Sequence, residues 1–245
     1  MAKRTPTYIH TFEAHNKRAA EIVLPLLFSI VKPQSLLDVG CGLGTWLEVA
    51  GELGIADFKG IEGQHVDVAK LSIPLDDLIF HDLTQPIFLN RKYDIVICLE
   101  VAEHLPESAS DILVKTLSDH SDLILFSAAV PGQGGQNHLN EKNLSYWSLK
   151  FGRMGYVLYD FVRPQIWNNK NVEVWYKQNM VVFCKGDYLE KELRPVSSPY
   201  IDIIHPDLFE FYSRQASRAA MYDEGKIGIR SSLASLLKSV RNKFI

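Results

Sequence analysis

Apolar residues recur at steps of three and four along residues 11–31, a spacing that places them on one face of an α-helix. These positions are Ala19, Ile22, Val23, Leu26, Leu27 and Ile30. Pro33 follows and is expected to end the helix. The pattern therefore predicts a helical N-terminal segment within residues 1–33.

Short apolar runs then alternate with helix-like segments. Strands are predicted at residues 35–39, 57–62, 77–81, 93–99 and 123–127. Helices are predicted at residues 46–53, 66–71 and 109–117. Strands that alternate with helices form right-handed crossovers, so this region is expected to be an α/β domain with a mostly parallel sheet and helices on both faces.

The pattern changes after Gly132, where glycine and polar residues replace the apolar runs. Further elements are predicted as a flexible loop at 131–138, a helix at about 144–155 and strands at 156–162 and 180–184. The last two strands would pair at one edge of the sheet. Residues 168–177, which are polar and aromatic, predict an exposed connection near the site.

From about His205 onward the pattern is helical and separate from the sheet. Residues 226–245 are basic, contain no acid and repeat apolar residues at helical spacing. Such a helix can lie on an anionic membrane surface, bind a partner groove or dock on its own domain. We expect an N-terminal helical segment at 1–33, a catalytic domain at 34–186 and a C-terminal helical tail at 187–245.

Composition narrows the class of protein. With 245 residues, 47% of them hydrophobic, the chain suits one packed domain with terminal segments, and its net charge of −3 gives no sign of a bulk nucleic-acid binder. Its cysteines, Cys41, Cys98 and Cys184, show no C-x-x-C pairing, which disfavours structural zinc and disulfides. Because no signal peptide or membrane-length apolar run is found, we expect a cytoplasmic protein, free or peripheral to the membrane.

Residues 36–47, LLDVGCGLGTWL, join an apolar run, an acid and three alternate glycines to a helix-compatible segment. This order predicts a buried strand, a tight turn and a helix N-terminus, where glycine permits positive φ and close approach of a ligand. Asp38 lies two residues before Gly40, so its carboxylate would repel a pyrophosphate but suits a ligand carrying an ammonium and a sulfonium. The alternative is a glycine-rich turn without a ligand.

This motif closely resembles the first motif of the class I S-adenosylmethionine-dependent methyltransferases. The resemblance covers residues 30–185. It implies a Rossmann-like, doubly wound sheet of seven mostly parallel strands with an antiparallel edge strand, plus N- and C-terminal helices, and S-adenosyl-L-methionine as cofactor. The binding residues on the motif itself would be Asp38, Gly40, Cys41, Gly42, Gly44 and Trp46.

Residues at the ends of the later predicted strands would complete the cofactor site, because ligands of an open α/β sheet bind outside the carboxyl ends of its strands. Glu62 ends the second strand, at the spacing of an acid that accepts the ribose hydroxyls. Asp82 and Leu83 follow the third strand, where the family's acid meets the adenine amino group. Leu99 and Glu100 end the fourth, where backbone carbonyls can meet the methionine ammonium.

The loop after the fourth predicted strand carries the candidate chemistry. Glu100, Glu103 and His104 form an E-x-x-E-H arrangement that could face one point from a single helical turn. His138, in the glycine-rich loop after the next strand, could reach the same place. We expect Glu103, His104 and His138 to act in catalysis, with His104, His138 or both as the general base.

The same residues resemble the magnesium site of small-RNA 2′-O-methyltransferases, and the first three also resemble the Glu–Glu–His set of ubiquinone-biosynthesis O-methyltransferases. The resemblance implies a Mg²⁺ ion that orients vicinal hydroxyls and lowers the pKa of one of them. Its ligands would be Glu100, Glu103, His104 and His138. In the alternative, no metal is bound: Glu100 binds the cofactor, Glu103 caps or solvates the next helix, and His104 acts alone in catalysis.

Residues 134–147 and 175–183 look like those of bacterial methyltransferases associated with surface-glycan and secondary-metabolite synthesis. The aromatic rings and amides of residues 167–169 and 175–179 suit sugar rings and polar heterocycles, or alternatively pack against the edge of the sheet. We therefore expect O-methylation of a hydroxyl on a sugar, a glycan or a polar small metabolite. Alternatives are N-methylation of a small amine and a cofactor-binding scaffold without turnover. A nucleic-acid acceptor is not expected, since basic residues do not cluster at the site, and the oligomeric state stays open.

Overall fold

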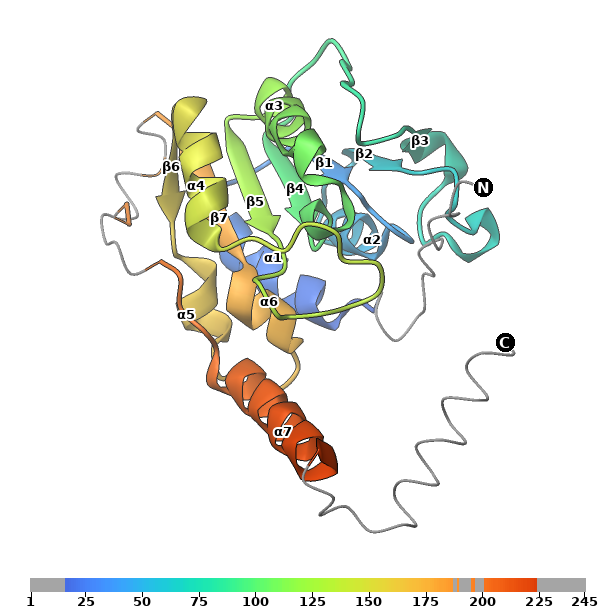
Figure 1. Ribbon diagram of the computed structural model, residues 1–245. Coiled ribbons are helices and arrows are strands. Elements are labelled where there is room, and N and C mark those ends of the chain that lie inside the picture. Colours follow the sequence, from blue (N-terminus) through green and yellow to red (C-terminus); the bar gives the residue numbers. More distant parts are fainter. Residues whose placement is uncertain (1–15, 187–188, 190–194, 197–200, 224–245) are drawn as a thin grey trace. The chain divides into compact units, whose positions relative to one another are not determined.

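One sheet of seven strands, in the order β3-β2-β1-β4-β5-β7-β6, organises the chain (Figure 1). The computed structural model describes residues 16–186, 189, 195–196 and 201–223. The strands are β1 (Ser35–Val39), β2 (Asp57–Glu62), β3 (Leu78–Phe80), β4 (Ile95–Leu99), β5 (Leu123–Ser127), β6 (Tyr156–Tyr159) and β7 (Val181–Lys185). Three of them, β1, β2 and β5, have the predicted bounds.

Strands β1 to β5 pair in parallel, and β7 is antiparallel to both of its neighbours, β5 and β6. The chain order reverses between β1 and β4, since β2 and β3 lie on one side of β1 and the later strands on the other. This is the topological switch point at which open α/β sheets bind ligands. The predicted Rossmann-like, mostly parallel sheet with an antiparallel strand near one edge is confirmed.

Neighbouring side chains on each central strand enter different cores. Leu36 and Ile97 belong to the core under α1, α2 and α5, whereas Leu37 and Val96 belong to the core under α3 and α4 (Figure 1). The helices are α1 (Arg18–Ile30), α2 (Thr45–Glu52), α3 (Ser110–His120), α4 (Leu144–Arg153) and α5 (Val162–Ile166). Because both faces of the sheet are covered, its strands are continuously apolar rather than alternating.

Two predicted segments differ from the structure. The helix expected at residues 66–71 is reduced to one 3-10 turn, Val68–Lys70, capped by the Asp67 side chain. Residues 168–177, expected to be an exposed connection, include the start of a helix, α6 (Val174–Asn179), in which Lys177 is buried. The Tyr176 ring packs edge-on against Trp46, with ring centroids 5.5 Å apart, so the later part of the segment covers apolar surface, whereas residues 168–171 are mostly exposed as predicted.

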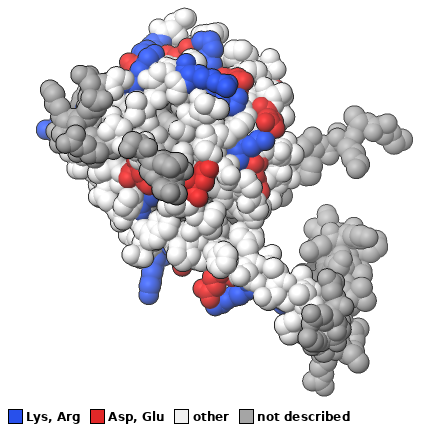
Figure 2. Space-filling view, turned by 60° about the vertical axis from the view of Figure 1, so that its left-hand side comes forward, with Lys and Arg blue, Asp and Glu red and all other residues white. Residues whose placement is uncertain are grey.

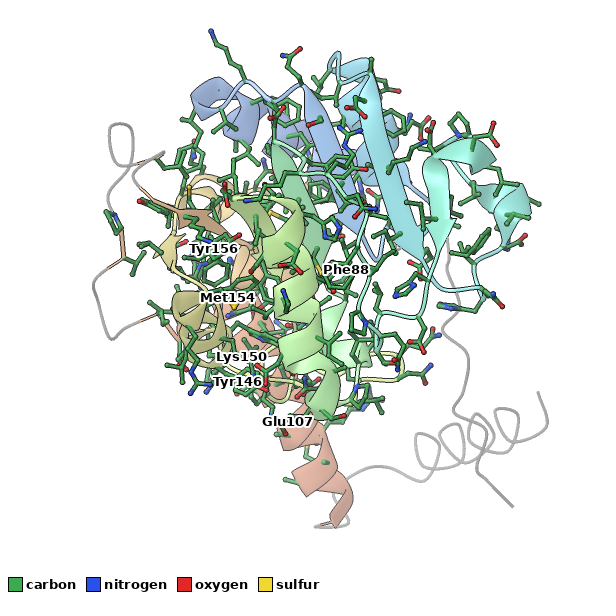
Figure 3. The ribbon with its side chains drawn as sticks, turned by 90° about the horizontal axis from the view of Figure 1, so that it is seen from above. Phe88, Glu107, Tyr146, Lys150, Met154 and Tyr156 are labelled. Carbon is green, nitrogen blue, oxygen red and sulfur yellow. The ribbon has the colours of Figure 1, made fainter. Side chains whose placement is uncertain are left out.

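Ion pairs connect the loop after β5 to the 3-10 turn Glu107–Ala109, and α4 to the adjoining α3. Lys142 contacts Glu107 at 2.8 Å and Lys150 contacts Asp111 at 2.6 Å. Both ammonium groups also lie over the Tyr146 ring. Figure 3 shows Tyr146 next to Glu107 and Lys150. Each contact of this kind contributes little to the stability of the fold on its own. Together they hold the end of the loop and α4 against the neighbouring segment.

A second compact unit begins at Ile204 and contains α7 (Pro206–Asp223), where a helix is predicted from about His205. The basic segment 226–245, with its expected membrane or partner contact, lies outside the described residues. Among the described helices, none combines the length and the apolar character that crossing a lipid bilayer requires.

Candidate active site

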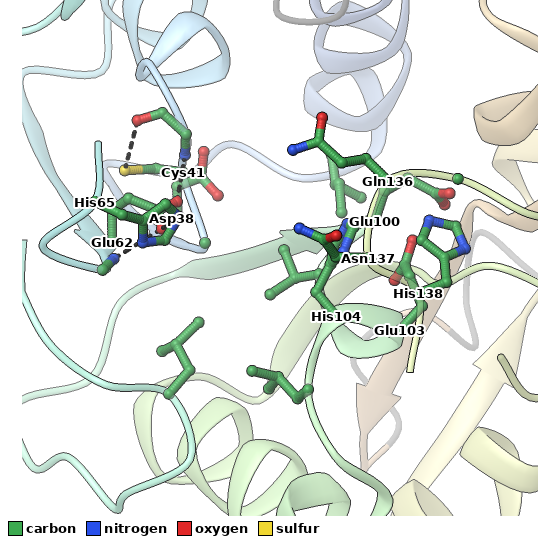
Figure 4. A pocket seen from close by; sticks show the side chains of 18 of the residues that line it. Asp38, Cys41, Glu62, His65, Glu100, Glu103, His104, Gln136, Asn137 and His138 are labelled. Carbon is green, nitrogen blue, oxygen red and sulfur yellow. Dashed lines mark hydrogen bonds and ion pairs between the residues drawn. The ribbon is translucent and has the colours of Figure 1, made fainter. Parts of the chain in front are cut away.

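A cavity of about 1100 Å³ opens at the carboxyl ends of the parallel strands. It brings together every predicted site residue except Gly44, which caps α2 and packs against Ile73. Its side chains form two groups (Figure 4). We call the first the glycine-turn half, comprising Asp38, Cys41, Glu62, His65 and the turn backbone, and the second the histidine half, comprising Glu100, Glu103, His104, Gln136, Asn137 and His138.

The turn after β1 has the backbone that its glycines predict. Gly40 has a φ of 80°, and a Cβ added there would lie 2.4 Å from a methyl group of Val101. The backbone N–H groups of Gly40 and Cys41 both donate to the Ile61 carbonyl, at 2.8 and 3.1 Å. Glycine is therefore required at position 40 both for conformation and for the close approach of the turn to the loop after β4.

Glu62 joins the turn to the end of β2. Its carboxylate oxygens accept the backbone N–H groups of Gly42 at 2.8 Å and Gly63 at 2.7 Å. Burial raises the pKa of Glu62, and burial together with the negative charge of Glu62 raises the pKa of Asp38 well above its usual range. Two buried acids at one end of a cavity form a site that a cationic group would stabilise.

The remaining predicted cofactor residues lie along the same rim. Asp82 is exposed, and its Oδ1 accepts the backbone N–H and the hydroxyl of Thr84, which lowers the pKa of Asp82. Leu83, Leu99 and Trp46 contribute buried apolar surface to the cavity. The glycine-turn half thus offers acids at one end and an apolar wall between them and solvent.

Glu100 is held in a left-handed backbone conformation, with a φ of 54°, directly after β4. Its Oε2 accepts the Gln133 amide at 2.9 Å, and its Oε1 accepts the Asn179 amide at 3.0 Å. The 3-10 turn that follows contains only Ala102–His104. Because Glu100 precedes this turn, its carboxylate is directed to the amides of Gln133 and Asn179.

Glu103, His104 and His138 gather in the histidine half, where one possible ligand atom from each lies within 4.8 Å of the others. The Glu103 side chain is fully buried, and neither of its carboxylate oxygens has a hydrogen-bond partner. The two imidazole rings meet edge to face, with centroids 4.9 Å apart. The structure therefore assembles three of the four predicted metal ligands, and Glu100 lies outside this group.

Electrostatics in the histidine half favour neutral groups. Burial, followed by the charge of Glu100, raises the pKa of Glu103 well above its usual range. Burial, followed by the nearby His138, lowers the pKa of His104 to about 4. His104 is consequently an uncharged imidazole at neutral pH, which is the form that accepts a proton.

Several residues of the cavity were missed by sequence reasoning. Gln64 and His65 line the glycine-turn half immediately after Glu62, and extending the strand-end rule by a few residues finds them. Gln133 lines the other half, where it joins Glu100 to Asn179. No local pattern predicts that contact, because it links three segments far apart in the chain.

The charge of the cavity wall is one-sided. Its carboxylates belong to Asp38, Glu62, Asp82, Glu100 and Glu103, and its imidazoles belong to His65, His81, His104 and His138. Among the described residues, no lysine or arginine lines it. On the face shown in Figure 2, Lys and Arg side chains lie interspersed with Asp and Glu. Such a wall lacks the cations that bind phosphate groups.

Comparison with known proteins gives a family. Residues 10–153, more than half of the chain, match the protein family described as a methyltransferase domain. No curated protein matches the chain.

Solved structures share the fold at low sequence identity. DesVI of Streptomyces venezuelae has a TM-score of 0.53 and 15% identity, covering 71% of this chain and 95% of its own. Magnesium protoporphyrin IX methyltransferase of Synechocystis, with bound S-adenosylhomocysteine, has a TM-score of 0.52 and 17% identity. The match covers 74% of this chain and 90% of that protein. CalS10, an amino pentose methyltransferase from Micromonospora echinaspora, has a TM-score of 0.50 and 15% identity. The match covers 74% of this chain and 99% of that protein.

Proposed function

The chain belongs to the methyltransferase-domain family, and from this premise we propose that it methylates a hydroxyl group on a sugar or another polar metabolite. With this family and its Rossmann-like sheet, the protein is an S-adenosylmethionine-dependent methyltransferase. The observation that carries the proposal is the joining of two sites in one cavity, a glycine turn with buried acids and a cluster of Glu103, His104 and His138.

The glycine-turn half fits the cofactor. Gly40 leaves open the space that a Cβ would fill, and Asp38 and Glu62 place buried carboxylates where an ammonium and ribose hydroxyls can bind. The Gly42 N–H now donates to Glu62, so the carboxylate is already oriented toward the turn. When bound there, S-adenosylmethionine supplies an activated methyl group on its sulfonium.

The histidine half fits an acceptor whose hydroxyl must lose a proton. His104 lines the cavity as a neutral imidazole, and its ring contacts that of His138. A neutral imidazole held next to the hydroxyl would accept its proton during methyl transfer. Trp175 and Tyr176 of α6 line the same cavity and offer faces on which a sugar ring can stack.

A divalent cation also fits the histidine half. The two orphaned, buried oxygens of Glu103 lie beside two imidazoles, and a cation there would offset the burial that now disfavours the carboxylate. One carboxylate and two imidazoles suit Mn²⁺, Co²⁺ or Zn²⁺ better than Mg²⁺, which prefers oxygen ligands. When bound, such an ion supplies Lewis-acid activation of the acceptor hydroxyl.

N-methylation is the second candidate. The acids of the cavity wall and the absence of lysine and arginine among its described residues suit an amine as well as a neutral hydroxyl. In both cases the wall disfavours an acceptor with a phosphate next to the methylated atom.

In the experiment that tests this, the full chain is incubated with S-adenosylmethionine and two matched panels of acceptors. One panel contains hydroxylated sugars and the other contains their amino-sugar counterparts. Formation of S-adenosylhomocysteine is measured with and without chelator, and after addition of Mg²⁺ or Mn²⁺. We expect turnover on hydroxyl acceptors and its loss in His104→Ala. Turnover confined to the amines would replace O-methylation by N-methylation, and cofactor binding without any turnover would leave a scaffold. Rates unchanged by chelator would dismiss the cation.

A further inference from the structure

The loop after β5 is folded around one carboxylate, that of Glu141. Its Oε2 accepts the Gly132 N–H at 2.7 Å, and its Oε1 accepts the Gly134 N–H at 2.7 Å. Oε1 also contacts Nδ1 of His138 at 2.8 Å. The Glu141 side chain is 19% exposed; its hydrogen bonds to the two backbone N–H groups lie at the surface, whereas its contact with His138 is partly buried. Glu141 therefore connects two backbone positions of the loop to one imidazole of the histidine half.

The contact between Glu141 and His138 determines which ring nitrogen of His138 carries hydrogen. An ionised carboxylate only accepts hydrogen bonds, so the nitrogen facing it, Nδ1, must be the donor. In a neutral imidazole the other nitrogen, Nε2, then keeps its lone pair. Nε2 is consequently the ring nitrogen of His138 that is left to accept a proton or to bind a cation, and His138 lies in one group with Glu103 and His104.

The opposite side of the ring packs closely on a glycine, Gly135. A Cβ placed on Gly135 would lie 2.2 Å from Nε2 of His138 and 2.6 Å from its Cε1. The chain beyond the ring is fixed as well, because the backbone N–H groups of Leu139 and Asn140 both donate to the Glu103 carbonyl, at 2.7 and 3.0 Å. The ring of His138 is thus held by Glu141 through Nδ1, and it fits only because residue 135 is a glycine, whose missing side chain leaves room for the ring.

We propose that Glu141 is a positioning residue for methyl transfer, which fixes the tautomer and orientation of His138 and so presents Nε2 to the acceptor. This inference rests on the proposed function, in which His138 acts on the acceptor or on a cation bound there. Carboxylates that orient a histidine in this way change activity or metal affinity by about 10- to 100-fold when removed.

The first test needs neither acceptor nor metal. The full chain is labelled with ¹⁵N in its imidazoles, and the signal of His138 is assigned by its loss in His138→Ala. We expect the Nδ1–H tautomer in the wild type and a shift toward Nε2–H in Glu141→Gln, because one amide oxygen cannot accept all three donors. Glu107→Gln is the matched control, since Glu107 pairs with Lys142 next to the loop but does not contact His138. An unchanged tautomer in Glu141→Gln overturns the proposal.

A second variant spares the carboxylate. Gly135→Ala places a methyl group against the His138 imidazole, with no backbone atom among its nearest contacts, so the fold should persist while the ring is displaced from Glu141 and the His138 signal moves. A His138 signal that stays in place in this variant contradicts the packing on which the argument rests.

Kinetics separate positioning from a merely structural role. On an acceptor found in the panel, we expect Glu141→Gln to lower kcat by about 10- to 100-fold with the affinity for S-adenosylmethionine unchanged. We expect it to have no further effect in the His138→Ala background. If Glu141→Gln lowers kcat equally in the His138→Ala background, Glu141 only supports the loop. That result overturns this proposal but leaves the proposed function intact. A wild-type rate in His138→Ala instead overturns both this proposal and the part of the proposed function assigned to His138.

Discussion

The two halves of the cavity are built by different means. The glycine-turn half is mostly backbone at strand ends, and its one connecting side chain, Glu62, bonds to N–H groups of residues 42 and 63. The histidine half consists of side chains from a 3-10 turn and a long loop, and its acids are bonded to amides or left without partners. The first half is built mainly from the glycine turn after β1 and the end of the neighbouring strand β2, whereas the second needs side chains from several segments that the whole fold brings together.

This difference separates binding from chemistry. Backbone that approaches a ligand closely can be specified by glycine spacing, and such a site suits a cofactor of constant shape. Side chains on loops can vary without disturbing the sheet, so they suit an acceptor that differs from enzyme to enzyme. Variants that affect one half and spare the other test whether the two roles are distinct.

The largest effect is expected from His104→Ala. Removal of a general base lowers rates by about 10²- to 10⁴-fold, so kcat should fall by that factor. Calorimetric titration with S-adenosylmethionine should give a dissociation constant within about twofold of the wild type, because His104 belongs to the other half. A cofactor affinity that falls together with kcat would show that the halves are not separable.

Glu62→Gln should produce the opposite pattern. Loss of the charged hydrogen-bond acceptor is expected to weaken binding of S-adenosylmethionine by about 10- to 100-fold, in line with about 1.5–3 kcal/mol for such a bond. At saturating cofactor, kcat should change little. Glu48→Gln is a suitable control, because Glu48 lies on α2 and pairs with Lys17 at the surface. Equal losses of affinity in the two variants would remove Glu62 from the site.

The pH profile sharpens the assignment of His104. Its pKa is lowered to about 4 because burial and the nearby His138 disfavour the protonated form. As a base it is active when neutral, so kcat should stay level down to about pH 5 and then fall by about tenfold per unit below pH 4. Stopped assays over this range, with stability of the fold monitored in parallel, measure it. A fall of kcat that begins near pH 6.5 would instead assign the base to a histidine with an ordinary pKa.

The smallest effect is expected at the junction between the halves. Asn179→Ala removes the amide that donates to both Glu100 and Gln133, at 3.0 and 2.9 Å. A buried hydrogen bond of this kind contributes about 1–2 kcal/mol, so the free energy of unfolding should drop by that amount. The KM of the acceptor should rise by about two- to fivefold, since α6 also carries Trp175 and Tyr176. An altered cofactor affinity with unchanged acceptor KM would contradict this arrangement.

Sequence reasoning placed most of the sheet and the glycine turn correctly, because strand burial and glycine spacing are local signals. It failed where a neighbour decided the outcome. Residues 168–177 look like an exposed connection, yet Trp46 gives Tyr176 an apolar partner from another helix. The E-x-x-E-H arrangement suggested three residues on one turn, but the 3-10 turn contains only Glu103 and His104, and the Glu100 carboxylate accepts the amides of Gln133 and Asn179 instead.

By itself, then, the sequence determined the class of protein. The order of the strands, the turn at residues 38–44 and the acids at the strand ends follow from periodicity and from residues that restrict backbone conformation locally. Only the tertiary structure decided what surrounds the acceptor. It buried Glu103, lowered the pKa of His104 and placed Glu141 against His138, and each of these depends on burial and on contacts between segments that no local pattern records.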